Sequence, residues 1–160
     1  MDSKIAFIGL GAMGGPMALN IIKKETNLFV FDIQKEKMKP HINLGAVPGE
    51  NIKETVQDAD IVITMLPSTK NVKSVIMDND GVLANVQPRT IILEMSTIAP
   101  KGTDEIYGAC VAKGVNFIDA PVGRLVSHAI SGDSLFMVGC DNEEAFKKVE
   151  PLLNAMVQLL

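Results

Sequence analysis

The sequence predicts an α/β domain in which helices cover both faces of a doubly wound, mostly parallel sheet. Apolar runs alternate with amphipathic runs along the whole chain of 160 residues, and this alternation is typical of strands joined by crossover helices. The apolar runs are short and continuous, as expected for strands that are buried on both faces. The first run leads directly into closely spaced glycines and a helix-like segment. We therefore expect a single domain over residues 1–160.

Composition and charge narrow the range of partners. Hydrophobic residues make up 47% of the chain, which is enough for a full core, and the net charge is −4. The lack of a basic block argues against nucleic-acid binding. No apolar run reaches the roughly 18 residues that span a bilayer, and no signal peptide is evident. We expect a cytoplasmic protein that binds neither nucleic acid nor membranes.

The cysteines and histidines do not indicate a metal site. Cys110 and Cys140 lack metal-type spacing, and we expect free thiols, with Cys110 on a helix and Cys140 at a strand end. His41 and His128 stand far apart in the sequence, and neither has a cluster of cysteine or carboxylate around it. We predict that both are surface or loop residues and that the chain binds no metal.

The first unit carries the most informative motif. Residues 4–8 predict a strand, residues 12–24 predict a helix, and Gly9-Leu10-Gly11-Ala12-Met13-Gly14 joins them. Gly9 allows a tight turn, Gly11 lets a pyrophosphate approach the backbone, and Gly14 lets the helix pack closely on the strand. The helix N-terminus offers N–H groups and a positive dipole end to the phosphates. The motif therefore predicts a dinucleotide-binding domain of the Rossmann type.

An acidic residue stands where this motif requires one. Residues 28–32 predict a second buried strand that ends at Asp32, about 20 positions after the glycines. A carboxylate at this position accepts hydrogen bonds from the adenosine ribose and repels a 2′-phosphate. We therefore expect NAD, as NADH, to be preferred over NADP, although Lys35 and Lys37 can offer positive charge to a phosphate.

The remaining elements follow from the same alternation and from turn and cap signals. Up to Gly81 we expect first a helix over 34–44 that Pro40 shortens or kinks, and then a short strand at 46–47. A capping box at Asn51 and Glu54 should begin a helix that reaches residue 57, and a strand at 61–66 should follow. The next helix should start at Ser68 or Thr69, in a unit that Gly81 ends. Beyond Gly81 we expect a strand at 90–95, a helix from Pro100 to Lys113 and a strand at 115–119. A loop with a short helix at 123–132 and a strand at 135–138 should follow. The last expected elements are a helix that is capped by Asp141 and Glu144 and reaches residue 156, and a strand from 157 onward.

Residues that follow the carboxyl ends of the expected strands are candidates for ligand contacts, because ligands of open parallel sheets bind at that edge. Leu66 and Pro67 follow one strand, and Leu66 is expected to form an apolar wall. Thr97 follows the next strand and offers a hydroxyl or backbone contact. Gly123 and Arg124 follow a third, and the planar guanidinium of Arg124 suits a carboxylate, sulfonate or phosphate.

Several motifs together resemble the β-hydroxyacid dehydrogenases, the 3-hydroxyisobutyrate dehydrogenase family. They are Phe7-Ile-Gly-Leu-Gly-Ala-Met-Gly-Gly-Pro-Met-Ala-Leu-Asn-Ile21, Thr64-Met-Leu-Pro67, Met95-Ser-Thr-Ile98 and Asp119-Ala-Pro-Val122. The resemblance covers essentially the whole chain. It implies an oxidoreductase that transfers hydride between a nicotinamide cofactor and a small anionic aldehyde or hydroxy acid. The cofactor contacts that it implies are Ala12, Met13, Asp32, Leu66 and Thr97.

The substrate loop departs from the usual pattern of this family. Most members have Ser-Gly-Gly after Pro-Val, whereas this chain has Gly123-Arg124-Leu125. Together with Ala129-Ile130-Ser131-Gly132, this loop resembles the sulfolactaldehyde reductase branch. That likeness implies reduction of 3-sulfolactaldehyde to 2,3-dihydroxypropane-1-sulfonate, with the sulfonate bound by Arg124. Two further departures, Gly132-Asp133-Ser134 and Gly139-Cys140, keep tartronate semialdehyde, 3-hydroxyisobutyrate and 4-hydroxybutyrate open as alternatives.

The resemblance also implies a C-terminal all-helical domain, not contained in this chain, that supplies a catalytic lysine and much of a dimer interface. Lys147 and Lys148 do not match the catalytic motif, so we expect no catalytic residue in this chain. The chain ends on the apolar run Val157-Gln-Leu-Leu160, and we expect the front part of a longer, homo-oligomeric enzyme that is inactive as this fragment. A dinucleotide-binding module without catalytic activity is the remaining alternative.

Overall fold

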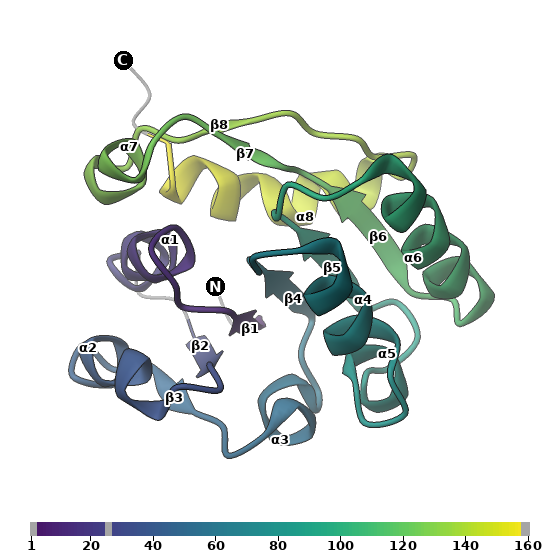
Figure 1. Cartoon of the computed structure of the whole chain (residues 1–160), viewed down its shortest axis with the longest axis horizontal. Helices are drawn as coiled ribbons and strands as arrows, with labels where there is room; N and C mark the ends of the chain where they lie inside the picture. Colours follow the sequence, from purple (N-terminus) through teal and green to yellow (C-terminus); the bar gives the residue numbers. More distant parts are fainter. Residues whose placement is uncertain (1–2, 25–26, 158–160) are drawn as a thin grey trace.

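Six parallel strands form one sheet in the order β3-β2-β1-β4-β5-β6 in the computed structural model (Figure 1). The structure describes residues 3–24 and 27–157. The strands are β1 (Lys4–Ile8), β2 (Asn27–Phe31), β3 (Val47–Pro48), β4 (Ile61–Thr64), β5 (Ile91–Glu94) and β6 (Asn116–Asp119). The chain winds outward from β1 to β3 and then returns to β4 on the other side of β1. The predicted doubly wound sheet is therefore confirmed, and its order reverses between β1 and β4.

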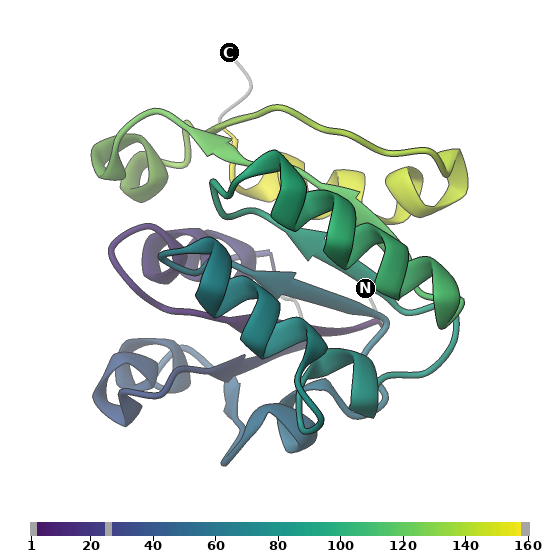
Figure 2. The ribbon, with the colours of Figure 1, turned by 45° about the vertical axis from the view of Figure 1, so that its right-hand side comes forward.

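Helices cover both faces of this sheet (Figure 2). One face is covered by α1 (Gly14–Ile22), the 3-10 helix η1 (Lys35–Met38), α7 (Val126–Ser131) and α8 (Glu143–Ala155). The other face is covered by α3 (Ile52–Val56), α4 (Thr69–Met77), α5 (Val82–Asn85) and α6 (Pro100–Ala112). A further helix, α2 (Lys39–Ile42), directly follows η1. No helix in the described part of the chain is long and apolar enough to cross a membrane.

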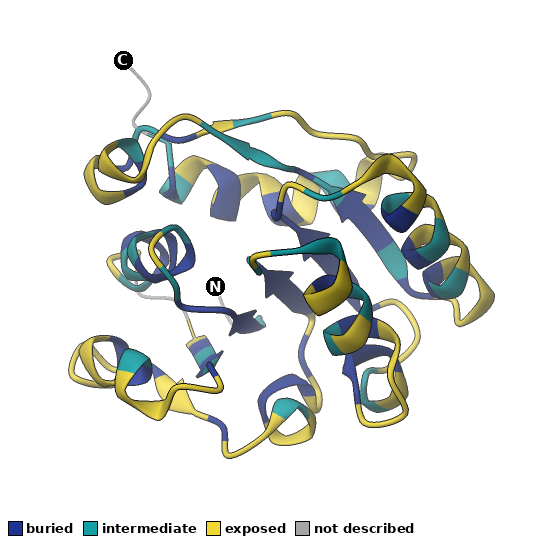
Figure 3. Ribbon diagram, in the orientation of Figure 1, coloured by how far each residue is buried: buried dark blue, intermediate teal, exposed yellow. Residues whose placement is uncertain are grey.

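The strands are apolar on both sides because each side meets a layer of helices. In β1, Ile5 and Phe7 pack in the cluster with α1 and α8, whereas Ala6 and Ile8 pack in the cluster with α4 and α6. All four of these side chains are buried. Figure 3 shows that β1, β4 and β5 are buried along most of their length, whereas β3 at the edge of the sheet is exposed.

Two of the three expected helix caps are confirmed. The Asn51 side chain accepts a hydrogen bond from the amide of Glu54, and Ser68 caps α4 in the same way. The predicted cap of α8 was wrong by one residue, since Asn142 accepts from the amides of the first helical turn. The Asp141 carboxylate instead accepts a hydrogen bond from the Tyr107 hydroxyl at 2.6 Å, which turns it away from α8.

Other differences from the predicted elements lie mostly in the second half of the chain. Gly81 ends no unit but precedes a short helix, α5. The expected strand at 135–138 is shortened to β8 (Leu135–Phe136), which pairs antiparallel with β7 (Val122–Gly123) outside the main sheet. Pro121 interrupts the chain after β6, and β7 then leaves the parallel sheet. Val157 forms an isolated bridge with Asp133, and the rest of the strand expected there lies outside the described residues.

The expectation that His41 lies at the surface was wrong. Its side chain is buried, and its ring nitrogens lie 2.9 Å from the Gly15 carbonyl oxygen and 3.1 Å from that of Lys37. Because α2 folds back against α1, the imidazole lies between these two segments instead of facing water. His41 is therefore a structural contact that fixes α2 beside the start of α1.

Candidate functional site

The three glycines of the loop after β1 have different structural roles. Gly9 has a φ of +98°, and a Cβ there would collide with the carbonyl oxygen of Met65. A Cβ on Gly14 would collide with the carbonyl oxygen of Gly9. A Cβ on Gly11 would meet no heavy atom within 4 Å. Gly9 and Gly14 are therefore needed for packing, whereas Gly11 faces the open space that the motif reserves for a pyrophosphate.

The backbone of this loop is arranged to bind an anion. Gly15 already donates a hydrogen bond to the Gly11 carbonyl oxygen at 2.9 Å, which begins the helical turn. The amides of Ala12 and Met13 have no acceptor among the residues that the structure describes. They lie at the N-terminal end of α1, where the helix dipole favours negative charge. These groups fit the pyrophosphate of a dinucleotide.

Asp32 lies immediately after β2 and is joined to the glycine loop. Its Oδ2 atom accepts a hydrogen bond from the Leu10 amide at 2.8 Å, and its Oδ1 atom accepts one from the Gln34 amide at 2.8 Å. The side chain is nearly buried, with 8% of the residue exposed. The carboxylate is thus held in place beside the loop, as the ribose contact requires. Of the two lysines considered as phosphate partners, Lys35 pairs with Glu50 at 2.8 Å.

The segments after β4 and β5 lie next to each other and next to the glycine loop. The Leu66 amide donates a hydrogen bond to the Ser96 hydroxyl at 2.8 Å. The Leu66 side chain also packs on Gly9, since a Cβ added to Gly9 would touch it. Pro67 and Thr97 are exposed at the same edge. The structure therefore brings three of the predicted contact residues to the edge that carries the glycine loop.

A buried carboxylate beneath these segments was not predicted. Glu94 ends β5 and is completely buried. It accepts hydrogen bonds from the Thr64 hydroxyl and, at 2.6 Å, from the Ser96 amide. Burial raises the pKa of Glu94 to about 7, although the hydrogen bonds from Ser96 and Thr64 act to lower it. The sequence signal that could have predicted this buried carboxylate is the glutamate within the apolar run 91–95, because an ionisable group is rarely buried in such a run without a partner.

Gly123 and Arg124 come close to the same edge through β7. The Val122 amide donates to the Met95 carbonyl oxygen at 3.1 Å, which places the start of β7 beside the segment after β5. Arg124 is exposed, has a φ of +70°, and donates from Nη1 to the Asp133 carboxylate at 2.7 Å. Sequence reasoning identified Arg124 but missed Asp133 as its partner.

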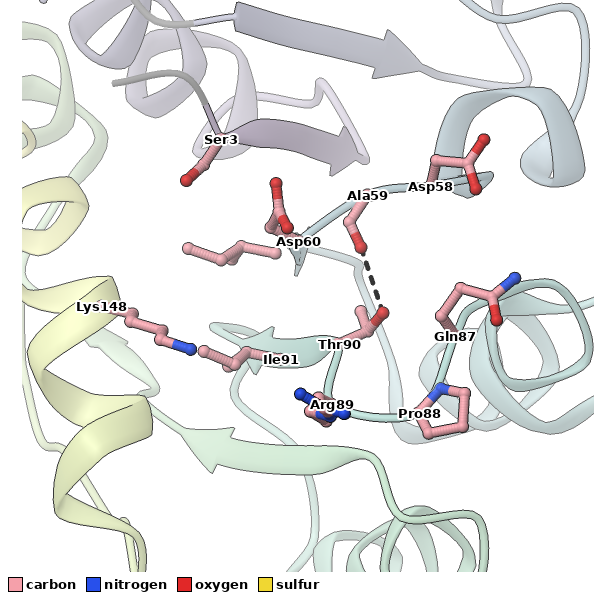
Figure 4. A pocket seen from close by; sticks show the side chains of 11 residues that line it. Ser3, Asp58, Ala59, Asp60, Gln87, Pro88, Arg89, Thr90, Ile91 and Lys148 are labelled. Atoms are coloured by element: carbon pink, nitrogen blue, oxygen red, sulfur yellow. Dashed lines mark hydrogen bonds between the residues drawn. The ribbon is translucent and has the colours of Figure 1, made fainter.

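A pocket with a volume of about 500 Å³ lies at the opposite edge of the sheet (Figure 4). Its lining includes Asp60 before β4, Arg89 and Thr90 before β5, and Lys148 of α8. The Thr90 hydroxyl donates to the Ala59 carbonyl oxygen at 3.1 Å across this pocket. None of the predicted contact residues lines it. The amino ends of the strands are not where open parallel sheets bind dinucleotides, so we do not assign the site there.

Comparison with known proteins also indicates a dinucleotide-binding domain. Residues 4–159 match the family described as the NAD binding domain of 6-phosphogluconate dehydrogenase. The chain is 42% identical to the NAD-dependent L-serine dehydrogenase of Pseudomonas aeruginosa and 38% identical to the 3-sulfolactaldehyde reductase of Escherichia coli. These alignments cover 96% and 95% of the chain and 51% of each relative, so the chain spans about half the length of the curated relatives it matches.

A solved structure gives the same result for the fold. The 3-hydroxyisobutyrate dehydrogenase of Mycobacterium tuberculosis with L-serine matches with a TM-score of 0.90 and 32% identity, over 98% of this chain and 53% of that one. The predicted family is therefore confirmed. The substrate is not determined, because relatives of similar identity are named for different substrates. The chain belongs to the family of the NAD binding domain of 6-phosphogluconate dehydrogenase, and its relatives place it in the 3-hydroxyisobutyrate dehydrogenase family.

Proposed function

We propose that this chain binds the cofactor in an NADH-dependent oxidoreductase whose substrate is a small anionic aldehyde or hydroxy acid. The observation that carries the proposal is the glycine loop, with Gly11 open to a ligand and Asp32 fixed beside it. The residues proposed to contact the cofactor are Gly9, Leu10, Gly11, Ala12, Met13, Gly14, Asp32, Leu66, Pro67 and Thr97. When bound, the nicotinamide supplies a hydride.

The chain's own residues contact three parts of the cofactor in this proposal. The amides of Ala12 and Met13 bind the pyrophosphate, and Asp32 binds the adenosine ribose and disfavours a 2′-phosphate. Leu66 and Thr97 shape the nicotinamide side of the crevice. A lysine outside this chain protonates the forming alkoxide, as general acid catalysis requires. The complete protein is proposed to be a cytoplasmic homo-oligomer.

Gly123 and Arg124 are proposed to hold the anionic end of the substrate. Within this class we place 3-sulfolactaldehyde first, because of the loop that carries Arg124 and the 38% identical reductase. Tartronate semialdehyde, 3-hydroxyisobutyrate and 4-hydroxybutyrate remain alternatives, since a guanidinium binds carboxylate and sulfonate alike.

L-Serine is a second candidate that a specific contact favours. The Asp133 carboxylate lies 2.7 Å from the Arg124 guanidinium, so the loop presents both a cationic and an anionic group. Such a pair suits a zwitterion, whose carboxylate faces Arg124 and whose ammonium faces Asp133. The relative that is 42% identical is named an L-serine dehydrogenase.

Steady-state kinetics of the complete enzyme test these assignments. We expect Arg124→Ser to raise the KM of the true substrate at least tenfold, which corresponds to the loss of about 1.4 kcal/mol. Asp133→Asn is the matched variant, because it removes the paired charge and keeps the shape. It should raise the KM for L-serine but not for a sulfonate or carboxylate aldehyde. An unchanged KM in Arg124→Ser removes this loop from the substrate site.

A further inference from the structure

The buried carboxylate of Glu94, at the end of β5, connects the segment after β4 with the segment after β5, and both segments face the proposed cofactor. Glu94 stands in register with Thr64 of β4 on one side and with Asp119 of β6 on the other. Its Oε2 atom accepts from the Thr64 hydroxyl, and its Oε1 atom accepts from the Ser96 amide at 2.6 Å. Glu94, Thr64 and Ser96, the three residues in these contacts, are all buried.

The contacts continue from Glu94 to the glycine loop. The Ser96 amide donates to Glu94, and the Ser96 hydroxyl accepts a hydrogen bond from the Leu66 amide at 2.8 Å. The Leu66 side chain in turn packs on Gly9. Thr97 directly follows Ser96 in the chain, so a change in the Ser96 backbone also moves Thr97. Glu94 therefore acts on both segments without facing the ligand space itself.

These segments lie on the side of the sheet that receives the second half of a dinucleotide. The glycine loop after β1 binds the pyrophosphate, and Asp32 after β2 binds the adenosine ribose. The ends of β4 and β5 lie across the point where strand order reverses, which is the side left for the nicotinamide half.

We propose that Glu94 is a positioning residue for the nicotinamide half of the cofactor, and that its ionised carboxylate holds the Leu66 and Thr97 segments in the binding arrangement. The inference rests on the dinucleotide-binding function proposed above. Hydrogen bonds to an ionised acceptor are roughly twice as strong as those to a neutral one. Protonation of Glu94 therefore weakens its hold on Ser96 and loosens both segments. Dinucleotide affinity then falls as the pH falls.

The surroundings of Glu94 place this transition near neutral pH. Burial is the main cause that raises its pKa to about 7, and the charge of Asp119 on β6 adds to the effect. Burial also raises the pKa of Asp119. Helix α6 buries the Cys110 thiol on this face, with a pKa raised to about 12, so that thiol stays uncharged. Lys73 of α4 and Glu105 of α6 pair with each other at the surface.

The test is a titration of the protein with NADH and with ADP-ribose, which lacks the nicotinamide, at pH 6.0 and pH 8.0. We expect the Kd for NADH to be about five- to tenfold higher at pH 6.0, and the Kd for ADP-ribose to change less than twofold. Glu94→Gln mimics the protonated acid at every pH. It should bind NADH at both pH values as weakly as the unmodified protein does at pH 6.0.

The matched control is Glu143→Gln, an exposed glutamate on α8, which should keep the full pH dependence. If Glu94→Gln fails to fold, Ser96→Ala removes the hydroxyl link to Leu66 and should reduce the pH dependence at least by half. The inference is overturned if the Kd for NADH does not change with pH, or if the Kd for ADP-ribose changes with pH by the same factor. It is also overturned if the Kd for NADH keeps its full pH dependence in Glu94→Gln or Ser96→Ala. If neither ligand binds at either pH, the proposed function fails as well, so the two failures are distinguishable.

Discussion

The Asp32 carboxylate accepts a hydrogen bond of 2.8 Å from the Leu10 amide, which ties the end of β2 to the second residue of the glycine loop. The residue proposed to read the ribose and the loop proposed to bind the pyrophosphate are thus one rigid unit. A second bond from the Gln34 amide, also 2.8 Å, holds the other carboxylate oxygen. Binding then requires little reorganisation of these groups, which favours affinity.

Replacing Asp32 should change cofactor choice as well as affinity. We expect Asp32→Ala to raise the Kd for NADH at least tenfold, because the ribose loses its acceptor and the Leu10 amide loses its partner. The preference for NADH over NADPH should shrink, since the repulsion of a 2′-phosphate is removed. Titration with both cofactors measures the ratio. Asp80→Asn, at an exposed position, should leave the ratio unchanged. If Asp32→Ala keeps the unmodified ratio, Asp32 is not the ribose contact.

The glycines of the loop should separate binding from folding. Gly11→Ala should weaken NADH binding and leave thermal stability nearly unchanged, because its Cβ meets only the ligand space. Gly14→Ala should destabilise the fold by roughly 2 kcal/mol or more through collision with Gly9. Gly108→Ala in α6 is the matched control: its Cβ is also unopposed, and it should stabilise the helix by about 0.5–1 kcal/mol without affecting binding. Unaltered NADH affinity in Gly11→Ala would place the pyrophosphate elsewhere.

The elements and residues that were predicted correctly depend on local sequence. The glycine loop, the Asp32 strand end and the Asn51 cap each follow from residues that are close in the chain. The Thr64, Glu94 and Ser96 contacts were not predictable in this way, because they require the registers of β4 and β5 to be known. The Arg124 and Asp133 pair depends on α7, which turns the chain back at Gly132 with a φ of +75°.

The error at His41 has the same origin. The sequence around His41 holds no cluster of metal ligands and therefore indicates a surface position, yet the residue is buried by contact with Gly15 of α1. Burial of a polar side chain depends on which distant backbone carbonyl can accept its hydrogen bond. That information lies in the packing of α2 on α1 and is not contained in either segment alone.

Buried Glu94 should make stability depend on pH in a defined direction. Its pKa of about 7 in the folded state lies above the ordinary value of 4.5 that it has in the unfolded chain, so the folded state binds the proton more tightly. The contribution to stability is complete below about pH 4.5 and is lost as the pH rises to about 7. Between pH 5.5 and 8 the loss is on the order of 2 kcal/mol.

Urea unfolding of the protein and of Glu94→Gln at pH 5.5 and pH 8 measures this contribution. The difference between the two proteins isolates Glu94 from all other titrating groups, provided that the m-values agree. We expect the unmodified protein to lose more stability than the variant as the pH rises. An equal loss in both would show that Glu94 is already ionised at pH 5.5.

The most direct test of the central claim is calorimetric titration of the unmodified chain with NADH and NADPH under identical conditions. The glycine loop and Asp32 predict saturable binding of NADH with a stoichiometry near one, and a Kd for NADPH at least tenfold higher. Binding of neither cofactor, or tighter binding of NADPH than of NADH, would contradict the assignment of this loop and of Asp32.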